Sequence, residues 1–260
     1  QGQRCVHDYL SRLAAAPAPP DVEPSAGGGG YALSQTGPVH VIALGKAACS
    51  MARGALDVLG TRIARAYVVT KEGYAEGLPW PCHIGGHPLP DERSLAAGAG
   101  LLEFIAALPR DAEVLVLLSG GASALVESPA AGIDLSKLRA ANEWLLASGL
   151  DIAQCNRVRK SLSLIKGGRL AARLAPRRVL CLAISDVPGD DAAIIASGPL
   201  VEDTQGDADI PGLPDSLRQS LRHPPPRPER DVFRAVRMDI IANLDQAKTA
   251  AAAAARQLGY

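Results

Sequence analysis

The segment EVLVLLSGGASAL, residues 113–125, joins a strand-like run to a run of small residues. Glu113–Leu118 is apolar on both faces that a strand would present, as strands buried in a parallel sheet are. Ser119–Ser123 follows, with glycines that let a backbone approach a ligand and with amide groups that can bind an anion. It lacks the Gly-x-Ser-x-Gly pattern of a hydrolase nucleophile. We predict a buried strand followed by a phosphate-binding turn, with a plain tight turn as the alternative.

Strand-like and helical segments alternate on both sides of this segment. Further strands are predicted at Val39–Leu44, Ala66–Thr70, Arg178–Ile184 and Val236–Ala242. Helices are predicted at residues 1–16, Ala47–Leu59, Glu92–Leu108 after an N-cap at Asp91, Leu135–Ser148, Asp151–Leu174 in pieces, and Leu244–Leu258. Such alternation is typical of βαβ units and a mostly parallel sheet. We therefore predict an α/β protein, a Rossmann-like three-layer sandwich.

Shifts in composition divide the chain into four predicted regions. Residues 1–38 combine a helix with a flexible Gly/Pro loop, and residues 39–204 form the Rossmann-like domain. Residues 205–230 are a Pro-rich connection. Residues 231–260 are a strand and a helix that lead toward a C-terminal domain absent from this chain.

The composition of the chain excludes several kinds of binding partner and structural class. The 260 residues include 27 Lys and Arg against 27 Asp and Glu, and aromatic residues make up 3%. A neutral chain with few rings is a poor binder of nucleic acid or of an anionic membrane, and no apolar run approaches the ~18 residues of a membrane span. The five cysteines are scattered and odd in number, which argues against a disulfide framework or a zinc ribbon. We expect a cytoplasmic protein whose oligomeric state the sequence leaves open, with a homodimer as one alternative.

Ligands of open α/β sheets bind beyond the carboxyl ends of the strands, so the segments that follow strands are the candidate binding loops. Gly45 and Lys46 directly follow the first predicted strand. Gly45 permits a tight turn, and Lys46 adds a charge where a helix N-terminus already attracts anions. The spacing is not that of a Walker A loop. We predict an anion site, with a lysine on a surface turn as the alternative.

A cationic segment begins at Asn156 and includes Arg159, Lys160 and Lys166. Two glycines at positions 167–168 are unfavourable inside a helix. Arginine and lysine beside an opened backbone suit a substrate carboxylate or phosphate. A solvated helix face is the alternative.

The segment SDVPGDD, residues 185–191, follows the strand at Arg178–Ile184 and carries three carboxylates. Asp186, Asp190 and Asp191 repel one another unless they share a cation. A Pro-Gly turn between them can point Asp186 and Asp190 at one place, and such oxygens suit Mg²⁺ carried with a nucleotide. An Asp-rich turn with an N-cap is the alternative.

His87 lies in the segment GHPLPD, residues 86–91. A histidine beside two prolines is held in a rigid loop, where it could orient a substrate hydroxyl. A structural histidine is the alternative.

Seven ordered motifs together resemble one family: GKAA at 45–48, GHPLPD at 86–91, SGGASAL at 119–125, NRVRK at 156–160, KGG at 166–168, SDVPGDD at 185–191 and ASGP at 196–199. The chain is similar to the amino-terminal domain of the class II glycerate kinases, whose carboxyl-terminal module is called MOFRL. Some members carry the label hydroxypyruvate reductase. The resemblance runs from Val39 to Tyr260 and is weakest at 205–230.

The resemblance implies ATP-dependent phosphorylation of D-glycerate, usually to 2-phosphoglycerate, with Mg²⁺. It also implies a Rossmann-like first domain and an active site in a cleft facing a second domain. The family's catalytic lysine falls on Lys46, and its acidic loop falls on Asp186–Asp191. Two departures are that Ala122 stands where the family usually has a third glycine and that the MOFRL module is missing from this chain.

These observations assign candidate roles. Lys46 and Asp186 are the predicted catalytic residues, because a carboxylate must orient or deprotonate the attacking hydroxyl and Asp186 lies nearest its strand end. Asp190 is the alternative for this carboxylate. Asp190 and Asp191 are the predicted metal ligands. The predicted substrate- or phosphate-binding residues are Gly45, His87, Ser119, Gly120, Gly121, Ser123, Asn156, Arg159, Lys160 and Lys166.

Two other functions remain open at this stage. A nicotinamide-dependent hydroxypyruvate reductase would need Gly-x-Gly-x-x-Gly after the first strand, where this chain has GKAACS at residues 45–50. A non-catalytic small-anion-binding domain would use the same turns, although clustered aspartates disfavour it. The sequence also leaves open whether position 2 or 3 of glycerate is phosphorylated.

Overall fold

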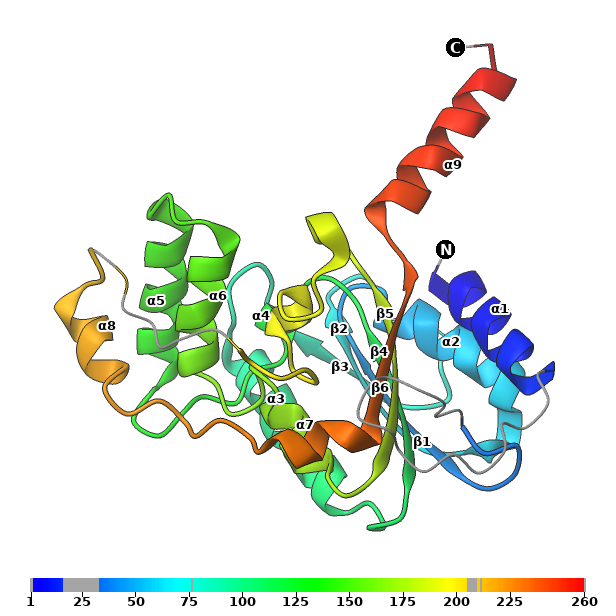
Figure 1. Cartoon of the computed structure of the whole chain (residues 1–260), viewed down its shortest axis with the longest axis horizontal. Coiled ribbons are helices and arrows are strands. Elements are labelled where there is room, and N and C mark those ends of the chain that lie inside the picture. Colours follow the sequence, from blue (N-terminus) through cyan, green and yellow to red (C-terminus); the bar gives the residue numbers. More distant parts are fainter. Residues whose placement is uncertain (1, 16–32, 76, 205–209, 211, 260) are drawn as a thin grey trace.

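The computed structural model of the protein describes residues 2–15, 33–75, 77–204, 210 and 212–259. Within these residues, six parallel strands form one sheet in the order β3-β2-β1-β4-β5-β6 (Figure 1). The strands are β1 (Val39–Leu44), β2 (Ile63–Lys71), β3 (Cys82–Gly85), β4 (Glu113–Leu118), β5 (Arg178–Ile184) and β6 (Val236–Ala242). The predicted α/β class and parallel sheet are confirmed.

The strand order reverses between β1 and β4. The chain builds outward from β1 through β2 to β3, returns to pair β4 with the other edge of β1, and continues through β5 to β6. This is the strand order of a dinucleotide-binding Rossmann sheet, in which ligands bind beyond the carboxyl ends of the two strands at the reversal, here β1 and β4. The sheet topology therefore marks the place to look for a ligand site.

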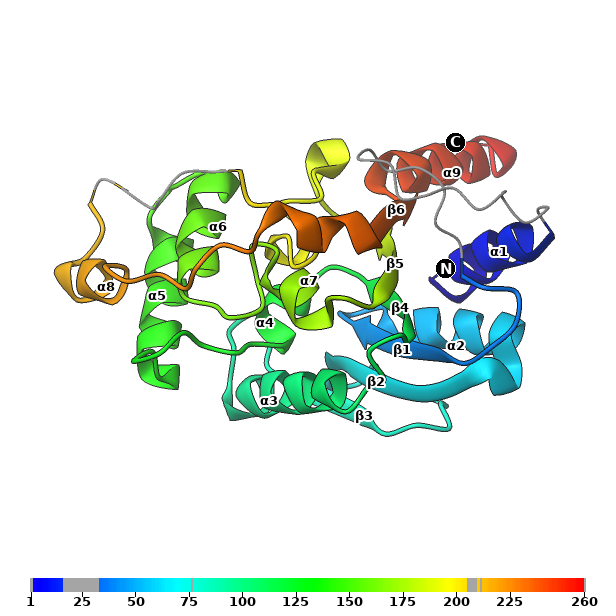
Figure 2. The same cartoon turned by 60° about the horizontal axis from the view of Figure 1, so that its bottom comes forward.

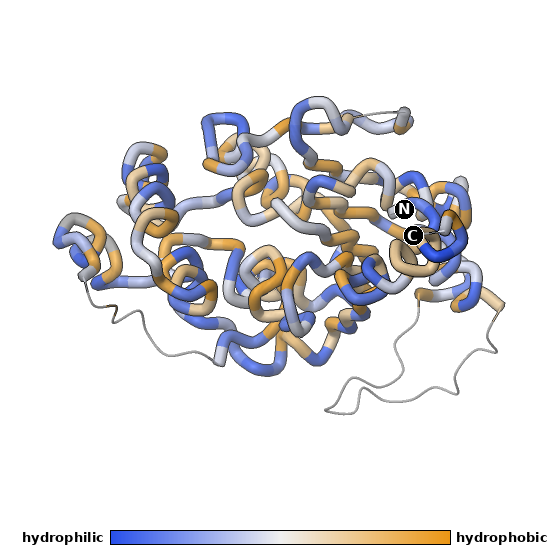
Figure 3. The backbone as a smooth tube through the Cα atoms, turned by 90° about the horizontal axis from the view of Figure 1, so that it is seen from above, coloured by the Kyte–Doolittle hydropathy of each residue, from blue (hydrophilic) through white to orange (hydrophobic). Residues whose placement is uncertain are grey.

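Helices cover both faces of the sheet (Figure 2). On one face lie α1 (Gly2–Ala15) and α2 (Ala48–Leu59), and on the other lie α3 (Glu92–Ala106) and α7 (Arg169–Leu174). Alternate residues of β1 enter the two cores: Val41 packs with α2, and Ile42 packs with α3. Figure 3 shows hydrophobic segments gathered in the interior of this three-layer body and hydrophilic ones around it.

The predicted helix starts follow ordinary capping chemistry. Asp91 caps α3, because its carboxylate accepts a hydrogen bond from the amide of Ser94 at 3.0 Å, and the Ser94 hydroxyl oxygen accepts one from the Asp91 amide at 3.2 Å. Asp151 and Asn243 cap later helices in the same way. None of the described helices is long and apolar enough to cross a lipid bilayer.

A smaller helical cluster lies beside the sheet body. It is formed by α5 (Leu135–Ala147), α6 (Ile152–Ser161) and α8 (Asp215–Ser220), which share their own apolar core. The predicted Pro-rich connection at 205–230 thus contains α8, whose Leu217 is buried in that core. Most of the predicted flexible loop at 17–38 lies outside the described residues.

The remaining elements are short, apart from the last helix. They are α4 (Ala122–Leu125), four turns of 3-10 helix (Gly60–Arg62, Pro188–Asp190, Ile195–Ser197 and Arg230–Ala235) and α9 (Leu244–Gln257). Strand β6 pairs with β5 and so belongs to the same sheet as residues 39–204. No described residue of α9 is buried, and the helix projects from the body in Figure 1.

Candidate active site

The loops after β1 and β4 meet at the point where the strand order reverses. The amide of Ser119 donates to the carbonyl of Leu44 at 3.0 Å, and the amide of Lys46 donates to the carbonyl of Gly120 at 3.0 Å. The Ser119 hydroxyl also accepts from the amide of Ala47 at 3.0 Å. These bonds join the two loops into one unit, with Lys46 at the start of α2.

Gly120 and Gly121 form a bare stretch of backbone that three side chains approach. A Cβ at Gly120 would overlap the carboxylate of Asp186. A Cβ at Gly121 would lie 3.1 Å from Cε of Lys46 and 3.1 Å from Cδ2 of His87. Only glycine leaves this space free, so the pair allows a cation, an imidazole and a carboxylate to converge. We call these five residues the glycine cradle.

Solvent reaches the cradle. His87 and Asp186 are exposed, and Lys46 is half-buried. Partial burial of the ring and the positive charges of Lys46 and Lys71 lower the pKa of His87, while the charge of Asp186 raises it. The net lowering keeps the imidazole neutral at pH 7, where one nitrogen can accept a hydrogen bond from a ligand hydroxyl.

The two predicted metal ligands, Asp190 and Asp191, lie farther along the loop after β5. The Asp190 carboxylate accepts a hydrogen bond from Nδ2 of Asn243, at 2.6 Å, and Asp191 accepts one from the amide of Ala193, at 2.8 Å. No three His, Cys, Asp or Glu side chains gather as a metal site among the described residues. A Mg²⁺ ion carried by a nucleotide requires only one or two carboxylates. Asp190 and Asp191 therefore remain the predicted ligands for such an ion.

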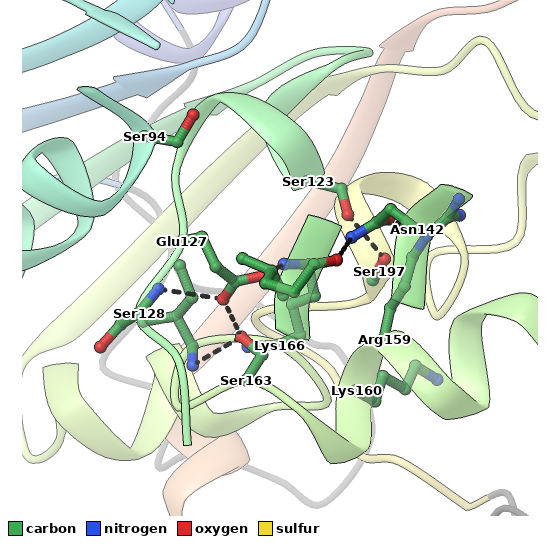
Figure 4. A network of polar contacts seen from close by, with 12 residues as sticks. Ser94, Ser123, Glu127, Ser128, Asn142, Arg159, Lys160, Ser163, Lys166 and Ser197 are labelled. Atoms are coloured by element: carbon green, nitrogen blue, oxygen red, sulfur yellow. Dashed lines mark hydrogen bonds and ion pairs between the residues drawn. The ribbon is translucent and has the colours of Figure 1, made fainter. Parts of the chain in front are cut away.

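Four more polar residues form a second group, which we call the Arg159 cluster. It contains Ser123, Asn156, Arg159 and Ser197, drawn from α4, α6 and the 3-10 turn at 195–197. The hydroxyls of Ser123 and Ser197 are 3.1 Å apart and face each other in Figure 4. Ser197 donates to Oδ1 of Asn156 at 3.2 Å, and a guanidinium nitrogen of Arg159 donates to the same oxygen at 3.4 Å.

Two of the predicted anion-binding lysines are engaged elsewhere. Lys160 and Lys166 are each 2% exposed. Lys160 pairs with Asp203 at 2.9 Å, and Lys166 pairs with Glu127. Ser163 also donates to Glu127, at 2.6 Å (Figure 4). These buried ion pairs indicate a structural role for Lys160 and Lys166, whereas the sequence pattern predicted that both ammonium groups contact a ligand.

The structure therefore separates the predicted catalytic and substrate- or phosphate-binding residues into three sets. The loops at the switch point bring together Gly45, Lys46, His87, Ser119, Gly120, Gly121 and Asp186. The Arg159 cluster contains Ser123, Asn156 and Arg159, and the ion pairs contain Lys160 and Lys166. Sequence reasoning missed Glu127, Ser163 and Asp203 altogether, and it saw Ser197 only as part of a tight turn.

The glycine cradle gives a steric prediction. Replacing Gly120 with alanine is expected to displace Asp186, because the new Cβ overlaps its carboxylate. Displacing a reacting group by about 1 Å costs ten- to a hundredfold in rate. The measurement is kcat for ATP turnover by the natural polypeptide that contains this chain.

A double variant supplies the control for this prediction. In an Asp186→Ala background the overlapping carboxylate is gone, so Gly120→Ala should add no further loss of activity. A full additional loss in the double variant would show that Gly120 acts independently of Asp186.

The chain is similar to several known proteins. A family model described as "Domain of unknown function (DUF4147)" matches residues 3–223. The "D-glycerate 2-kinase" of Thermotoga maritima is 43% identical over 173 residues, which are 66% of this chain and 42% of that protein. A "putative hydroxypyruvate reductase" of Agrobacterium vitis is 47% identical over 163 residues, which are 62% of this chain and 42% of that protein.

A solved structure gives the same relationship. The crystal structure of a glycerate kinase from Thermotoga maritima matches with a TM-score of 0.73 and 31% identity, over 99% of this chain and 63% of that one. This chain matches less than half of the length of the curated relatives named above. The family resemblance inferred from the seven motifs is confirmed.

Proposed function

This chain belongs to the DUF4147 family, and on that premise we propose that it carries part of the active site of a glycerate kinase, which transfers the γ-phosphoryl group of ATP to a hydroxyl of D-glycerate. One observation carries the proposal. The side chains of Lys46, His87 and Asp186 converge on bare glycine backbone beyond the carboxyl ends of β1 and β4. The names of the relatives from Thermotoga maritima support the same activity.

The residues of the cradle match the demands of phosphoryl transfer, in which most of the catalysis is positioning and stabilisation of charge. Lys46 would place its ammonium against the oxygens of the transferred group. His87, neutral at pH 7, would accept a hydrogen bond from a substrate hydroxyl and orient it. Asp186 would take the proton of the attacking hydroxyl.

Magnesium and the product are further parts of the proposal. Mg²⁺ bound with ATP would supply neutralisation of phosphate charge, and Asp190 and Asp191 are the residues of this chain proposed to hold it. We propose that the product is 2-phosphoglycerate, which the name of the Thermotoga maritima relative supports. A phosphorus NMR spectrum of the reaction mixture separates the 2- and 3-phosphates.

An ADP-release assay tests the proposed function. The natural polypeptide that contains this chain should consume ATP only when both D-glycerate and Mg²⁺ are present. Oxidation of NADH with hydroxypyruvate, without ATP turnover, would instead establish the reductase named for the Agrobacterium vitis relative. Binding of anions with neither reaction would establish the non-catalytic alternative.

A comparison of two aspartates separates a base from a metal ligand. Asp186→Asn is expected to lower kcat by about 10²- to 10⁴-fold, the range that general base catalysis supplies. Raising the Mg²⁺ concentration should not restore that rate, because the missing group is a proton acceptor. The measurement is kcat as a function of Mg²⁺ concentration.

Asp190→Asn is the matched variant for this comparison. Its activity should fall at low Mg²⁺ and recover as Mg²⁺ rises, since a weakened metal ligand is compensated by mass action. Recovery of Asp186→Asn at high Mg²⁺ would reassign Asp186 to the metal.

A further inference from the structure

We propose that the Arg159 cluster is a subsite for the carboxylate of a short hydroxycarboxylic acid. The carboxylate would bind there while the hydroxyl of the same molecule lies over Gly120 and Gly121. This inference rests on the proposed function and assigns the part of the substrate that the glycine cradle does not hold. Three independent features of the cluster carry it: its charge, an unpartnered buried donor and its backbone.

The charge of the cluster is one unneutralised cation. Of the three cations in the segment from 156 to 166 that the sequence placed at a ligand, two are neutralised by Asp203 and Glu127. Among the described residues, Arg159 donates only to amide oxygens, at 3.2 Å to Asn142 and 3.4 Å to Asn156. Across the part of the chain that the structure describes, no carboxylate lies within ion-pair distance of Arg159.

Burial makes that single charge significant. Arg159 is half-buried, and desolvation lowers the pKa of its guanidinium. A desolvated cation without a counter-ion is unfavourable, and an anion bound beside it relieves that cost. The planar guanidinium presents paired donors that match the two oxygens of a carboxylate.

The unpartnered donor is the amide nitrogen of Asn156. Asn156 is 3% exposed, and its Nδ2 has no hydrogen-bond partner in the structure, while its Oδ1 accepts from Ser197 and Arg159. Buried polar groups are rarely left unsatisfied, because the hydrogen bonds they lose to water are then not replaced. A ligand oxygen in the cluster would give this nitrogen its acceptor.

The backbone at the bottom of the cluster is held in an uncommon conformation. Ala196 and Ser197 both have positive φ, 51° and 61°, although neither is glycine. Non-glycine residues in this region cost free energy and concentrate at binding and catalytic sites. Here the turn brings the Ser197 hydroxyl to the Ser123 hydroxyl, at 3.1 Å. Ser123 is partly exposed and can meet a ligand from solvent.

Size and charge together select the ligand class. Ser123 is two residues from Gly121, so their Cα atoms are at most about 7 Å apart. A molecule that bridges Ser123 and the cradle therefore has a short carbon skeleton. One guanidinium among neutral donors matches a single carboxylate, whereas the several charges of a nucleotide polyphosphate would need more cations. The geometry thus favours the acid over the nucleotide at this place.

The test measures two affinities in variants of the natural polypeptide that contains this chain. Arg159→Gln and Ser123→Ala should each weaken the Kd for D-glycerate measured by calorimetry, by about ten- to a hundredfold for the arginine, since it makes a charge-assisted contact. The Kd for ADP should not change. In steady-state kinetics, KM for D-glycerate should rise while kcat stays unchanged. This is the result expected when the lost contact binds the ground state and the transition state equally well.

Two further variants control for structure. Arg157→Gln replaces an arginine of the same helix whose side chain makes no hydrogen bond or ion pair with the cluster in the described residues, and it should leave both affinities unchanged. Arg159→Lys keeps the charge but loses the paired donors, so it should restore part of the D-glycerate affinity. Ser123→Ala tests the subsite if Arg159→Gln fails to fold. This variant should fold, because Ser197 keeps its hydrogen bond to Asn156.

The outcomes distinguish this inference from the proposed function. A loss of ADP affinity with D-glycerate affinity intact would overturn the subsite in favour of a nucleotide phosphate, and no change in either would make the cluster structural. If the unaltered polypeptide shows no ATP turnover with D-glycerate, the proposed function fails. Calorimetry with D-glycerate and with lactate then still decides the subsite: binding lost in Arg159→Gln supports it, and binding that is absent or unaffected overturns it.

Discussion

Replacing Lys46 with alanine is expected to lower kcat for D-glycerate phosphorylation by at least about 10²-fold while leaving the protein folded. Removal of one positioned donor from a developing oxyanion typically costs 10²- to 10³-fold. Lys46 is half-buried and its aliphatic chain lies against the bare backbone of Gly121, so the fold loses little packing when it is shortened. The measurements are kcat by ADP release and the thermal unfolding midpoint.

Lys137→Ala is the control for this prediction. Lys137 is an exposed lysine of α5 whose ammonium donates to the carbonyl of Gly132, at 2.7 Å. The variant removes the same charge far from the glycine cradle and should keep full activity. If Lys46→Ala also retained near-normal kcat, Lys46 would be a surface residue and the proposed catalytic centre would be wrong.

The bounds of four strands could be predicted from the sequence to the residue. The predicted bounds of β1, β4, β5 and β6 agree with the structure. In β1, β4 and β5, a mostly apolar run is required because helices pack on both sides of a parallel sheet, and Gly45, Ser119 and Ser185 end these runs. The loops after these strands were therefore also placed correctly, which brought Lys46, Ser119 and Asp186 into view.

Short elements with mixed composition could not be predicted in the same way. Strand β3 has four residues, and His83 in its middle is exposed at the edge of the sheet. Helix α8 has six residues and follows prolines and glycines, so its identity depends on Leu217 finding the core of α5 and α6. The run Asp151–Leu174, predicted in pieces, divides into α6 and α7 across residues 162–168, where Gly167 and Gly168 adopt positive φ. For β3 and α8, tertiary contacts outweigh local pattern.

The ion-pair partners of the charged residues in the candidate site could not be predicted from the sequence either. The sequence reveals that cations are dense after residue 156 but not which of them have partners. Lys160 meets Asp203 and Lys166 meets Glu127 across about 40 residues of sequence, and only the fold brings these pairs together. Both carboxylates lie outside any motif. Arg159 alone among the three keeps its charge unneutralised within the described residues, and this fact separates a ligand contact from a structural one.

The ion pair between Glu127 and Lys166 should be a major determinant of stability in this part of the fold. Lys166→Met is expected to lower the free energy of unfolding by about 3–5 kcal/mol, because it leaves the Glu127 carboxylate buried without its counter-charge. Both side chains are at most 4% exposed. The remaining bonds of Glu127, from Ser163 and from the Ser128 amide at 2.9 Å, cannot replace a cation. Urea denaturation of the natural polypeptide measures the change.

A double variant separates the cost of a lone charge from the value of the pair. Glu127→Gln combined with Lys166→Met removes both charges while keeping a hydrogen-bonding group at position 127. The double variant should recover most of the lost stability, because replacing both members of a buried ion pair by uncharged residues often leaves the free energy of unfolding almost unchanged. Lys248→Met, which breaks the exposed pair with Asp245, should leave the unfolding midpoint unchanged. A Lys166→Met variant as stable as the unaltered protein would mean that Glu127 does not depend on this ammonium. Lys166 would then be available to a ligand, as its sequence motif first indicated.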